Sequence, residues 1–436
     1  MEYNKLTLQF IYIVKNMLIP LLKSPFLTIW FVYICFSILK LMKHFLYKLL
    51  ISCFAFLLFS CNNKKDAEST VKLNKDGIPI LQSFEDEMPQ LTTNYVNEKK
   101  QKVSAFFDKV WNKNDNVSFL VAQNGQVIYE NYMGFANKNR GENISKETPL
   151  HIASVSKVLT ATAILMLVDA DKIKLEQKVT EFIPDFPYPE ITVQTLLNHR
   201  SGMKNYAYFT YKTGVWDNNK ELTNQDIVMI MKNFKVPLES KTNSRFAYCN
   251  TNYAMLALII EKVTGLKYPD AMQEMIFKPL GMMHTFVYET SKHLGKVSLS
   301  YKGNMDLAVE YLDGIYGDKN IYSTPRDLLK FDIARYSSSY LNPNLLKKVY
   351  QGYSHECKGE RNYGLGIRML EFDKGEPFYY HNGWWHGNTS CYINMRKEKV
   401  TMFVISNKYT KKTYKTKKLA PLFGDYPFKT IDETEE

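Results

Sequence analysis

Two strand-forming regions near the two ends of the chain constrain the fold more than any other feature. Residues 118–132, SFLVAQNGQVIYENY, hold two β-prone runs around Asn124-Gly125, a dipeptide that favours a tight hairpin. Near the C-terminus, four further runs are typical of successive antiparallel strands: YGLGIRML, PFYYHNG, TSCYINM and VTMFVIS. Residues 154–340, between the two regions, have a mainly helical pattern. The sequence therefore predicts one antiparallel sheet to which both chain ends contribute.

This order of elements predicts a two-lobed α+β fold. One lobe is an antiparallel sheet built from both chain ends and flanked by helices, and the other is an inserted all-α lobe. Residues 95–113 carry apolar side chains at helical spacing and predict one flanking helix. Thr324-Pro325-Arg326-Asp327 predicts the start of another helix, and Gly265 predicts the end of a third. Active sites often lie in the cleft between two such lobes.

The N-terminal segment, residues 1–61, is interpreted as a targeting signal. Residues 42–61 read MKHFLYKLLISCFAFLLFSC, a short basic region followed by an apolar run and a cysteine. This pattern resembles a bacterial lipoprotein signal, in which the thiol of Cys61 is lipidated and becomes the new N-terminus. The apolar run is short for a membrane span. We therefore expect a lipid anchor that holds a soluble body on the membrane.

Two further apolar blocks, residues 7–22 and 25–39, precede this signal. Either they are additional membrane segments or translation begins at Met42, and we favour the second explanation. The predicted organisation is then a polar tether over residues 62–94, a globular domain over 95–425 and a polar tail over 426–436. The expected location is the cell envelope, lipid-anchored to a bacterial membrane, with the globular domain outside the cytoplasm.

Charge and cysteine usage exclude several classes of function. The net charge is +12, but the one dense basic run near the C-terminus is typical of a solvated surface and has no base-reading element. That run comprises Lys411, Lys412, Lys415, Lys417 and Lys418. Cys249, Cys357 and Cys391 follow the signal without CxxC spacing, so one bridge is possible and its pairing stays open. There is no HExxH and no Cys/His cluster with ligand spacing, so we expect no nucleic acid, metal or cofactor.

A Ser-x-x-Lys pattern supplies the first candidate for chemistry. It occurs at residues 69–72, 154–157 and 201–204, but only Ser154 opens a long apolar stretch of good helix formers. A serine in the first turn of a helix gains from the positive end of the dipole. The i,i+3 spacing places Lys157 on the same face, where its amine can accept the hydroxyl proton. Ser154 and Lys157 are therefore a candidate nucleophile and base.

A Tyr-x-Asn pattern and a His-x-Gly pattern supply the second and third candidates. Tyr-x-Asn occurs five times, and the copy at Tyr248–Asn250 directly precedes an apolar helix. A phenol near an ammonium can act as a base, and the Asn250 amide can bond a substrate carbonyl and the lysine. The alternative is a helix cap by Asn250 with a packed tyrosine. His381-Asn382-Gly383 lies in a predicted strand, whose backbone can approach a substrate closely at Gly383.

Together these motifs resemble the serine β-lactamase and penicillin-binding-protein superfamily. The motifs are SVSK at 154–157, YCN at 248–250 and HNG at 381–383, supported by LLNHRSGM at 196–203 and IYSTPRDLLKF at 321–331. The resemblance covers about residues 100–407, in the order of the family, and is strongest to the class C-like branch with its esterase and D-peptidase relatives. It implies a β-lactamase/transpeptidase-like fold.

The resemblance implies a role for each matching residue. Ser154 is the expected nucleophile, Lys157 its base partner and Tyr248 a general base. Asn250, His381 and Gly383 are the expected substrate-binding residues. The backbone N–H groups of Ser154 and Trp384 are the expected oxyanion hole.

The third motif departs from the family. His381 and Asn382 replace the Lys and Thr that help to hold a substrate carboxylate, and a neutral imidazole is a weaker anion anchor. Trp384 and Trp385 add bulk beside the glycine. Both changes favour an ester or peptide substrate over efficient penicillin hydrolysis. A literal Lys212-Thr213-Gly214 precedes Tyr248 in a loop-like stretch, the wrong place for this motif unless the chain is permuted.

The predicted function is that of a serine hydrolase working through a covalent acyl-enzyme. The expected substrate is a small-molecule or peptide ester, amide or D-amino-acid peptide, with weak action on β-lactams. No GxSxG nucleophile elbow occurs, which counts against the α/β-hydrolase class. The alternative function is a penicillin-recognising or cell-wall-binding module without turnover.

Overall fold

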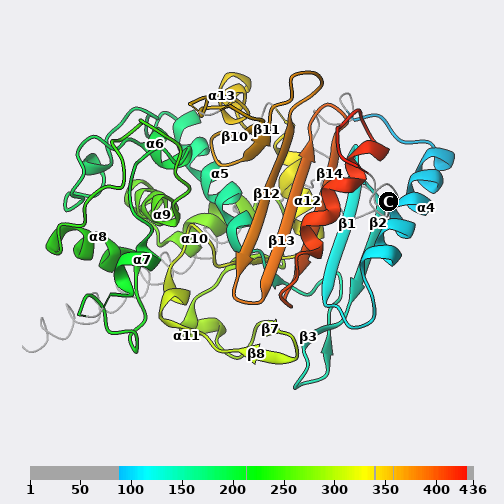
Figure 1. Ribbon diagram of the computed structural model, residues 1–436, viewed down its shortest axis with the longest axis horizontal. Helices are drawn as coiled ribbons and strands as arrows, with labels where there is room; N and C mark the ends of the chain where they lie inside the picture. Colours follow the sequence, from blue (N-terminus) through cyan, green and yellow to red (C-terminus); the bar gives the residue numbers. More distant parts are fainter. Residues whose placement is uncertain (1–87, 213, 338–339, 357, 430–436) are drawn as a thin grey trace, which may run out of the picture. The chain divides into compact units, whose positions relative to one another are not determined.

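The computed structural model describes residues 88–212, 214–337, 340–356 and 358–429. Their centre is a seven-stranded antiparallel sheet with the strand order β10-β11-β12-β13-β14-β1-β2 (Figure 1). The strands are β1 (Val117–Gln123), β2 (Gln126–Met133), β10 (Arg361–Tyr363), β11 (Arg368–Leu370), β12 (Phe378–Trp385), β13 (Asn388–Met395) and β14 (Val400–Ser406). Strand β14 pairs with β1, so both chain ends do build one sheet, as predicted.

Turn residues explain two features of this sheet. Asn124 and Gly125 between β1 and β2 have φ angles of 51° and 70°, the left-handed conformations that a tight hairpin requires. The run YGLGIRML, expected to be one strand, instead contains the last residue of β10, a turn and all of β11. Gly366, with a φ of 92°, reverses the chain between them, so that expectation was wrong.

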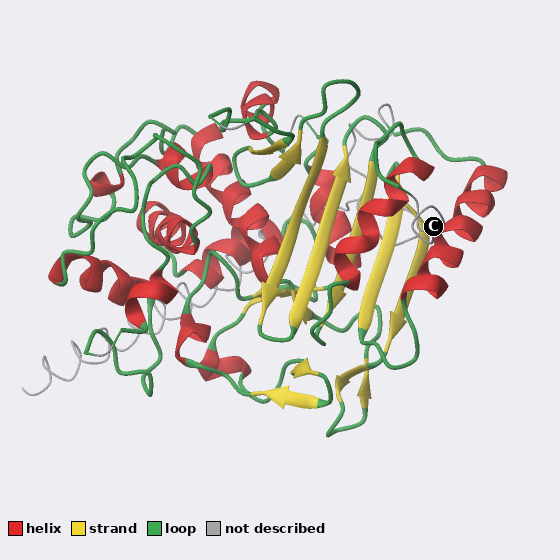
Figure 2. Ribbon diagram, viewed as in Figure 1, coloured by secondary structure: helices red, strands yellow, loops and turns green. Residues whose placement is uncertain are grey.

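Helices cover both faces of the sheet (Figure 2). Side chains alternate along β1, so that Phe119 joins one apolar cluster and Leu120 joins the other. The first cluster contains the helix α4 (Thr93–Val110) and part of the 3₁₀ segment η6 (Lys412–Leu422). The second contains α5 (Ser156–Asp169) and α12 (Pro325–Ala334). This alternation produces the flanked sheet that the sequence predicts.

The segment between β2 and β10 contains the remaining helices and several short strands. Its helices are α6 (Val193–Leu197), α7 (Tyr206–Thr210), α8 (Asn224–Asn233), α9 (Asn250–Thr264), α10 (Tyr268–Met272), α11 (Thr290–His293) and α13 (Pro343–Val349). Its strands are β3 (Phe135–Asn137), β4 (Glu142–Asn143), β5 (Leu150–His151), β6 (Phe286–Val287), β7 (Ser300–Lys302), β8 (Met305–Leu307) and β9 (Ile321–Ser323). Shorter turns are η2 (Ala153–Val155), η3 (Val179–Glu181), η5 (Tyr311–Gly314) and the π-helical η4 (Gln273–Phe277).

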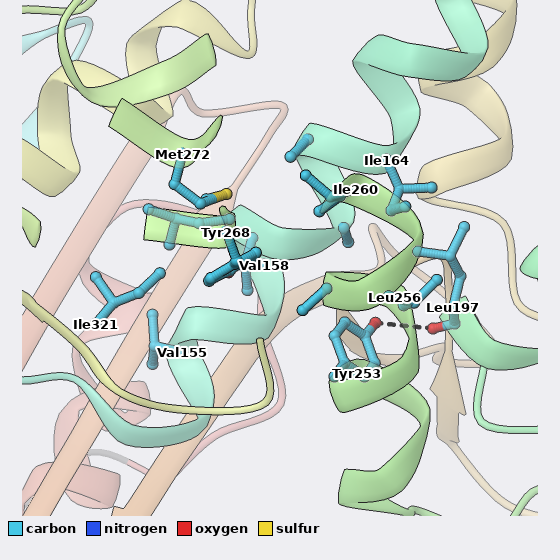
Figure 3. Close-up of a cluster of buried hydrophobic side chains, with 14 of the residues drawn as sticks. Val155, Val158, Ile164, Leu197, Tyr253, Leu256, Ile260, Tyr268, Met272 and Ile321 are labelled. Atoms are coloured by element: carbon cyan, nitrogen blue, oxygen red, sulfur yellow. Dashed lines mark hydrogen bonds between the residues drawn. The ribbon is translucent and has the colours of Figure 1, made fainter. Parts of the chain in front are cut away.

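Helices α5 and α9 form the centre of the helical lobe (Figure 3). Val158 and Ile164 of α5 lie in the same buried cluster as Leu256 and Ile260 of α9. Both helices are buried over most of their residues, which is why they lack the polar face of a surface helix. This packing sets the start of α5 and the start of α9 beside each other, and both predicted catalytic motifs lie at those starts.

Two predicted helix boundaries are confirmed. The Thr324 hydroxyl accepts a hydrogen bond from the backbone N–H of Asp327 (3.2 Å), which caps α12. Gly265 ends α9 with a φ of 72°.

The edges of the globular domain extend beyond the predicted boundaries. Helix α4 begins at Thr93, within the predicted tether, because the Thr92 hydroxyl caps it through the N–H of Tyr95 (3.4 Å). Met88 is already buried, and Tyr426 of the predicted tail packs in the cluster under α4. The predicted signal, Cys61 and Met42 lie outside the described residues. Within the described part of the chain, no helix combines the length and hydropathy that crossing a membrane requires.

Candidate active site

Ser154 lies in η2, immediately before α5. The residue before it, Ala153, has a φ of 48°, a left-handed conformation that costs a residue with a Cβ about 1–2 kcal/mol. The Ala153 N–H donates to Nδ1 of the buried His151 (3.0 Å), and the Ile152 N–H donates to the Ile321 carbonyl (2.9 Å). These bonds hold the turn that presents Ser154, which is partly exposed, at the start of a buried helix.

Lys157 is fully buried one turn along from Ser154. Its Nζ donates to Ser154 Oγ (3.1 Å) and to the Asp318 carbonyl (2.6 Å). No carboxylate pairs with this ammonium among the described residues. The amine is therefore held against the serine hydroxyl, the contact that transfer of the hydroxyl proton requires.

Tyr248 precedes α9 and lies above Lys157. The Lys157 Nζ is 5.2 Å from the centroid of the Tyr248 ring, and the Arg368 guanidinium carbon is 4.4 Å from it. The ring also packs on His199, with 4.3 Å between centroids. The phenol hydroxyl forms no hydrogen bond with another described residue. Two cations thus flank a phenol whose oxygen is available to a substrate.

Asn250 is the first residue of α9, and Cys249 occupies the cap position. The alternative in which Asn250 caps the helix is therefore not what the structure shows. Its Oδ1 is buried without a hydrogen-bond partner among the described residues. Asn250 and Lys157 form no hydrogen bond, and the Lys157 ammonium instead donates to Ser154 Oγ and to the Asp318 carbonyl. A buried amide oxygen without a partner is a binding group for a substrate donor.

His381 lies in β12 with its ring buried beneath Tyr248, 6.3 Å between centroids. Its Nδ1–H donates to the Asn382 carbonyl (3.0 Å), and its Nε2 accepts from the Tyr363 hydroxyl (3.1 Å). Burial, with the nearby Arg368 and Lys157 charges, holds the pKa of His381 well below its usual value. The imidazole is neutral at pH 7 and offers no positive charge to a substrate anion.

Gly383 brings β12 against the segment before Ser154. A Cβ at this position would lie 2.6 Å from the Ile152 carbonyl oxygen and 3.0 Å from the Ala153 Cβ. The Tyr414 hydroxyl donates to the Gly383 carbonyl (2.9 Å). Beyond it the Trp384 side chain is 63% exposed. Only a glycine allows this approach of strand and serine turn.

Three residues at the site were not predicted as site residues. His199 supports the Tyr248 ring and accepts from the Cys249 N–H (3.2 Å), which orients the Tyr248–Asn250 segment. Asp318 holds Lys157, and Arg368 covers Tyr248. His199 occurs in the stretch LLNHRSGM, which the resemblance already marked, whereas Arg368 carries no local sequence signal.

The other copies of the motifs lie elsewhere. The Ser201 hydroxyl donates to Asn252 Oδ1 (2.6 Å) and accepts from the Met203 N–H (3.1 Å), so it holds a turn. Ser69, of the first Ser-x-x-Lys copy, lies outside the described residues, and so does Thr213, the middle residue of the literal Lys-Thr-Gly. Within the described ranges, no group of three or more His, Cys, Asp or Glu could hold a metal ion. Cys249 and Cys391 are buried free thiols, and Cys357 is outside the description.

Comparison with known proteins places this chain in a family. The sequence model described as "Beta-lactamase" matches residues 103–420. "Penicillin-binding protein 4*" of Bacillus subtilis is 28% identical over 327 residues, 71% of this chain and 72% of that protein. A D-aminopeptidase of Cereibacter sphaeroides is 24% identical over 290 residues, 66% of this chain and 55% of that protein.

Solved structures show the same fold. A penicillin binding protein from Bacillus halodurans has a TM-score of 0.64 at 22% identity, covering 74% of this chain and 99% of its own. The D-amino acid amidase from Ochrobactrum anthropi SV3 has a TM-score of 0.57 at 24% identity, covering 72% and 91%. Since the family model matches well over half of the sequence, the chain belongs to the beta-lactamase family.

Proposed function

We propose that the protein is a serine hydrolase that forms a covalent acyl-enzyme on an ester, an amide or a D-amino-acid peptide. The observation that carries this proposal is the contact of Lys157 Nζ with Ser154 Oγ at 3.1 Å, directly below the Tyr248 ring. An alcohol and an amine from one segment meet there with a phenol that is about 90 residues away in the sequence. This set of groups is suited to nucleophilic acyl transfer without a metal.

The proposed reaction has two stages. The Ser154 oxygen attacks the substrate carbonyl carbon while the Lys157–Tyr248 pair takes its proton, and the same pair returns a proton to the leaving group as the acyl bond breaks. Water then attacks the acyl-serine, and the acid product leaves. Asn250, whose Oδ1 has no partner among the described residues, accepts a hydrogen bond from a substrate N–H or O–H.

The N–H groups of Ser154 and Trp384 are the proposed oxyanion hole. In support, β12 and β13 are joined by a loop of two residues, His386 and Gly387. In such a hairpin the two residues that flank the loop, here Trp385 and Asn388, are hydrogen-bonded to each other. Successive residues of a strand point their backbone N–H groups to alternate sides, so the Trp384 N–H points away from β13, to the edge of β12 that faces β11. Strand β11 leaves that edge uncovered, since its pairing with β12 ends at Tyr380. Gly383 brings the same edge to the Ser154 turn.

The neutral His381 favours esters and peptides over β-lactams. A buried imidazole without charge contributes little to holding the carboxylate of a penicillin. The resemblance to a D-aminopeptidase and a D-amino acid amidase supports an amide or a D-amino-acid peptide as substrate. We therefore expect slow acylation by β-lactams and faster turnover of small esters and D-amino-acid amides.

A covalent serine probe tests this function. The purified chain is labelled with a fluorophosphonate and, separately, with a fluorescent penicillin that is then chased. We expect the fluorophosphonate label to vanish in Ser154→Ala and to persist in Ser201→Ala, which alters the other described Ser-x-x-Lys motif. Penicillin label that decays indicates turnover, whereas label that persists supports a penicillin-recognising module. Full labelling of a folded Ser154→Ala protein would refute the proposed nucleophile.

We further propose that Cys61 carries a lipid that anchors the protein to a bacterial membrane, with the catalytic domain outside the cytoplasm. The support is the signal-like sequence before Cys61. Metabolic labelling with a fatty acid should mark the wild-type protein and not Cys61→Ser. Equal labelling of both would contradict the anchor.

A further inference from the structure

A groove of about 1150 Å³ lies beside Tyr248 and takes no part in the acyl-transfer steps above. It runs along β11, β12 and β13 on the face of the sheet that η6 covers, between η6 and the loop that precedes β10. Six aromatic side chains line it, namely Phe246, Phe372, Phe378, Tyr380, Tyr414 and Phe428. Asn382 and Arg368 lie at the side of the groove that adjoins the candidate active site. Its size suits an extended substituent of a substrate.

The charge of this groove is positive. Five cations line it, namely Arg245, Lys358, Arg361, Arg368 and Lys417. The two lining carboxylates are Glu356 and Glu360, and Glu356 already pairs with Arg200, with 2.9 Å between the charged atoms. Cations clustered in a concave surface raise the local concentration of anionic ligands.

Arg368 is the cation of the groove that lies over the Tyr248 ring. It lies in β11 opposite Tyr380 of β12, and its guanidinium carbon is 4.4 Å from the Tyr248 centroid and 5.8 Å from the Tyr363 centroid. It forms no ion pair with a carboxylate among the described residues. Two aromatic rings therefore hold a guanidinium whose hydrogen-bond donors are available for an oxyanion.

The third motif cannot supply this charge. His381 lies on the opposite face of β12 from Tyr380, is fully buried, and uses both ring nitrogens within the protein. Lys157 is likewise engaged with Ser154 and Asp318. A charge for an anionic substrate next to Tyr248 therefore comes from β11.

We propose that the groove binds an oxyanion, a carboxylate or a phosphate, on the acyl substrate, and that Arg368 is its anchor. The aromatic walls pack against the chain that carries the oxyanion, and the more exposed cations attract it. Arg368 thereby determines specificity for a substituent that lies in the groove, on the other face of β12 from the position of His381. This inference rests on the proposed function, because it describes the substrate of the same acyl-transfer site.

Matched substrates of the full-length chain test the proposal. On the acyl side, the p-nitrophenyl monoester of glutaric acid is compared with that of glutaramic acid, which replaces the carboxylate by an amide. On the leaving-group side, phenyl butyrates carry a para carboxylate, phosphate or carboxamide. We expect kcat/KM for an anionic member of at least one set to exceed that of its neutral partner by roughly tenfold or more. The preferred member of the second set distinguishes carboxylate from phosphate.

Arg368→Gln should bring the ratio of kcat/KM for the anionic substrate to kcat/KM for its neutral partner close to one. Arg368→Lys should restore part of this ratio. Arg140→Gln removes the same charge from an exposed loop outside the groove and should leave the ratio unchanged. The wild-type preference should also shrink as salt rises from 0.05 to 0.5 M, since screening weakens a partly exposed ion pair. If Arg368→Gln does not fold, this salt series with the wild-type protein tests whether an ion pair holds the anionic substrate.

A wild-type ratio near one in both sets, or an undiminished ratio in folded Arg368→Gln, would overturn the inference. Labelling of Ser154 by a neutral fluorophosphonate separates this failure from failure of the proposed function. If Ser154 is labelled but no anionic substrate is preferred, only the groove assignment falls. If Ser154 is not labelled, the proposed function itself falls.

Discussion

At the scale of single residues, positive charge and neutral rings surround Ser154. Lys157 contacts its hydroxyl, and Arg368 lies over the Tyr248 ring. The imidazoles of His199 and His381 lie against the same tyrosine, and burial lowers the pKa of both well below the usual value. Such a setting stabilises negative charge on a bound substrate more than positive charge on a histidine.

Loss of the amine tests its proposed role directly. In Lys157→Ala, the rate of Ser154 acylation should fall by about 10²–10⁴-fold, the usual contribution of a positioned proton acceptor. The rate is measured by stopped-flow with a chromogenic ester, and Lys204→Ala, from the Ser201 motif, is the matched control. An unchanged rate in folded Lys157→Ala would show that another group takes the proton.

Buried histidines predict how stability depends on pH. Burial lowers the pKa of His151 to about 4 and places the pKa values of His199 and His381 well below 6.5, so in the folded protein all three stay neutral where the unfolded chain binds protons. Their contribution to stability is present above about pH 6.5 and is lost as the pH falls, by about 1.4 kcal/mol per group and pH unit.

Urea unfolding between pH 7.5 and 5.5 measures this slope. The free energy of unfolding should decrease steadily below pH 6.5, and His381→Gln should make the decrease shallower by about one proton. The slope is the observable because the substitution also changes stability at pH 7.5. A wild-type free energy that rises on acidification would contradict neutral buried imidazoles.

At the scale of elements, the active site depends on the approach of β12 to the Ser154 turn. Gly383 makes that approach possible, and the Ser390 hydroxyl of β13 donates to the Ile152 carbonyl across it (2.6 Å). The strand edge and the start of α5 therefore form one unit. Small movements of this unit change the distance between the proposed oxyanion donors and the nucleophile.

A methyl group at Gly383 should separate these elements. Its Cβ would lie 2.2 Å from Ser390 Oγ and 2.6 Å from the Ile152 carbonyl oxygen, and the second is backbone that can move only with the turn. We expect Gly383→Ala to lower ester turnover by more than tenfold, because displaced oxyanion donors cost about 10²–10³-fold. Circular dichroism verifies the fold. Full activity in the folded variant would show that this approach is not needed.

Local sequence predicted the helices, strands and turns better than it predicted which residues of distant elements contact each other. Asn124-Gly125, Thr324 and Gly265 encode a hairpin, a cap and a helix end through their own backbone preferences, so these could be read directly. The break between β10 and β11 was missed, because a β-rich run containing two glycines fits either a strand or a turn. Arg368 was missed because its place over Tyr248 is set by sheet pairing, which no short motif encodes.

At the scale of the whole molecule, buried polar groups join the helical layer to the sheet. The Asp332 carboxylate of α12 accepts hydrogen bonds from Tyr392 of β13, from Asn394 (2.8 Å) and from Thr401 of β14. The buried Arg335 donates to the Tyr392 hydroxyl (2.8 Å). Despite this network, burial raises the pKa of Asp332. The network fixes α12 on the sheet behind the active site.

Removing the central carboxylate should destabilise the entire domain. Asp332→Ala removes the acceptor of three buried donors, on Tyr392, Asn394 and Thr401, and each buried donor left without a partner costs about 1–3 kcal/mol. Urea unfolding at pH 7.5 measures the loss, and Glu142→Ala, which breaks an exposed ion pair with Arg140, is the control with an unchanged midpoint. A loss no larger than that of the control would mean that the network does not hold the layers together.

The most direct test of the account is intact-mass and peptide analysis of the wild-type chain, acid-quenched during turnover of a p-nitrophenyl ester. We predict an added acyl mass that maps to the peptide containing Ser154, disappears once substrate is exhausted, and is absent from Ser154→Ala. Turnover that continues in Ser154→Ala, or an acyl group on another residue, would contradict the central claim that Ser154 is the nucleophile.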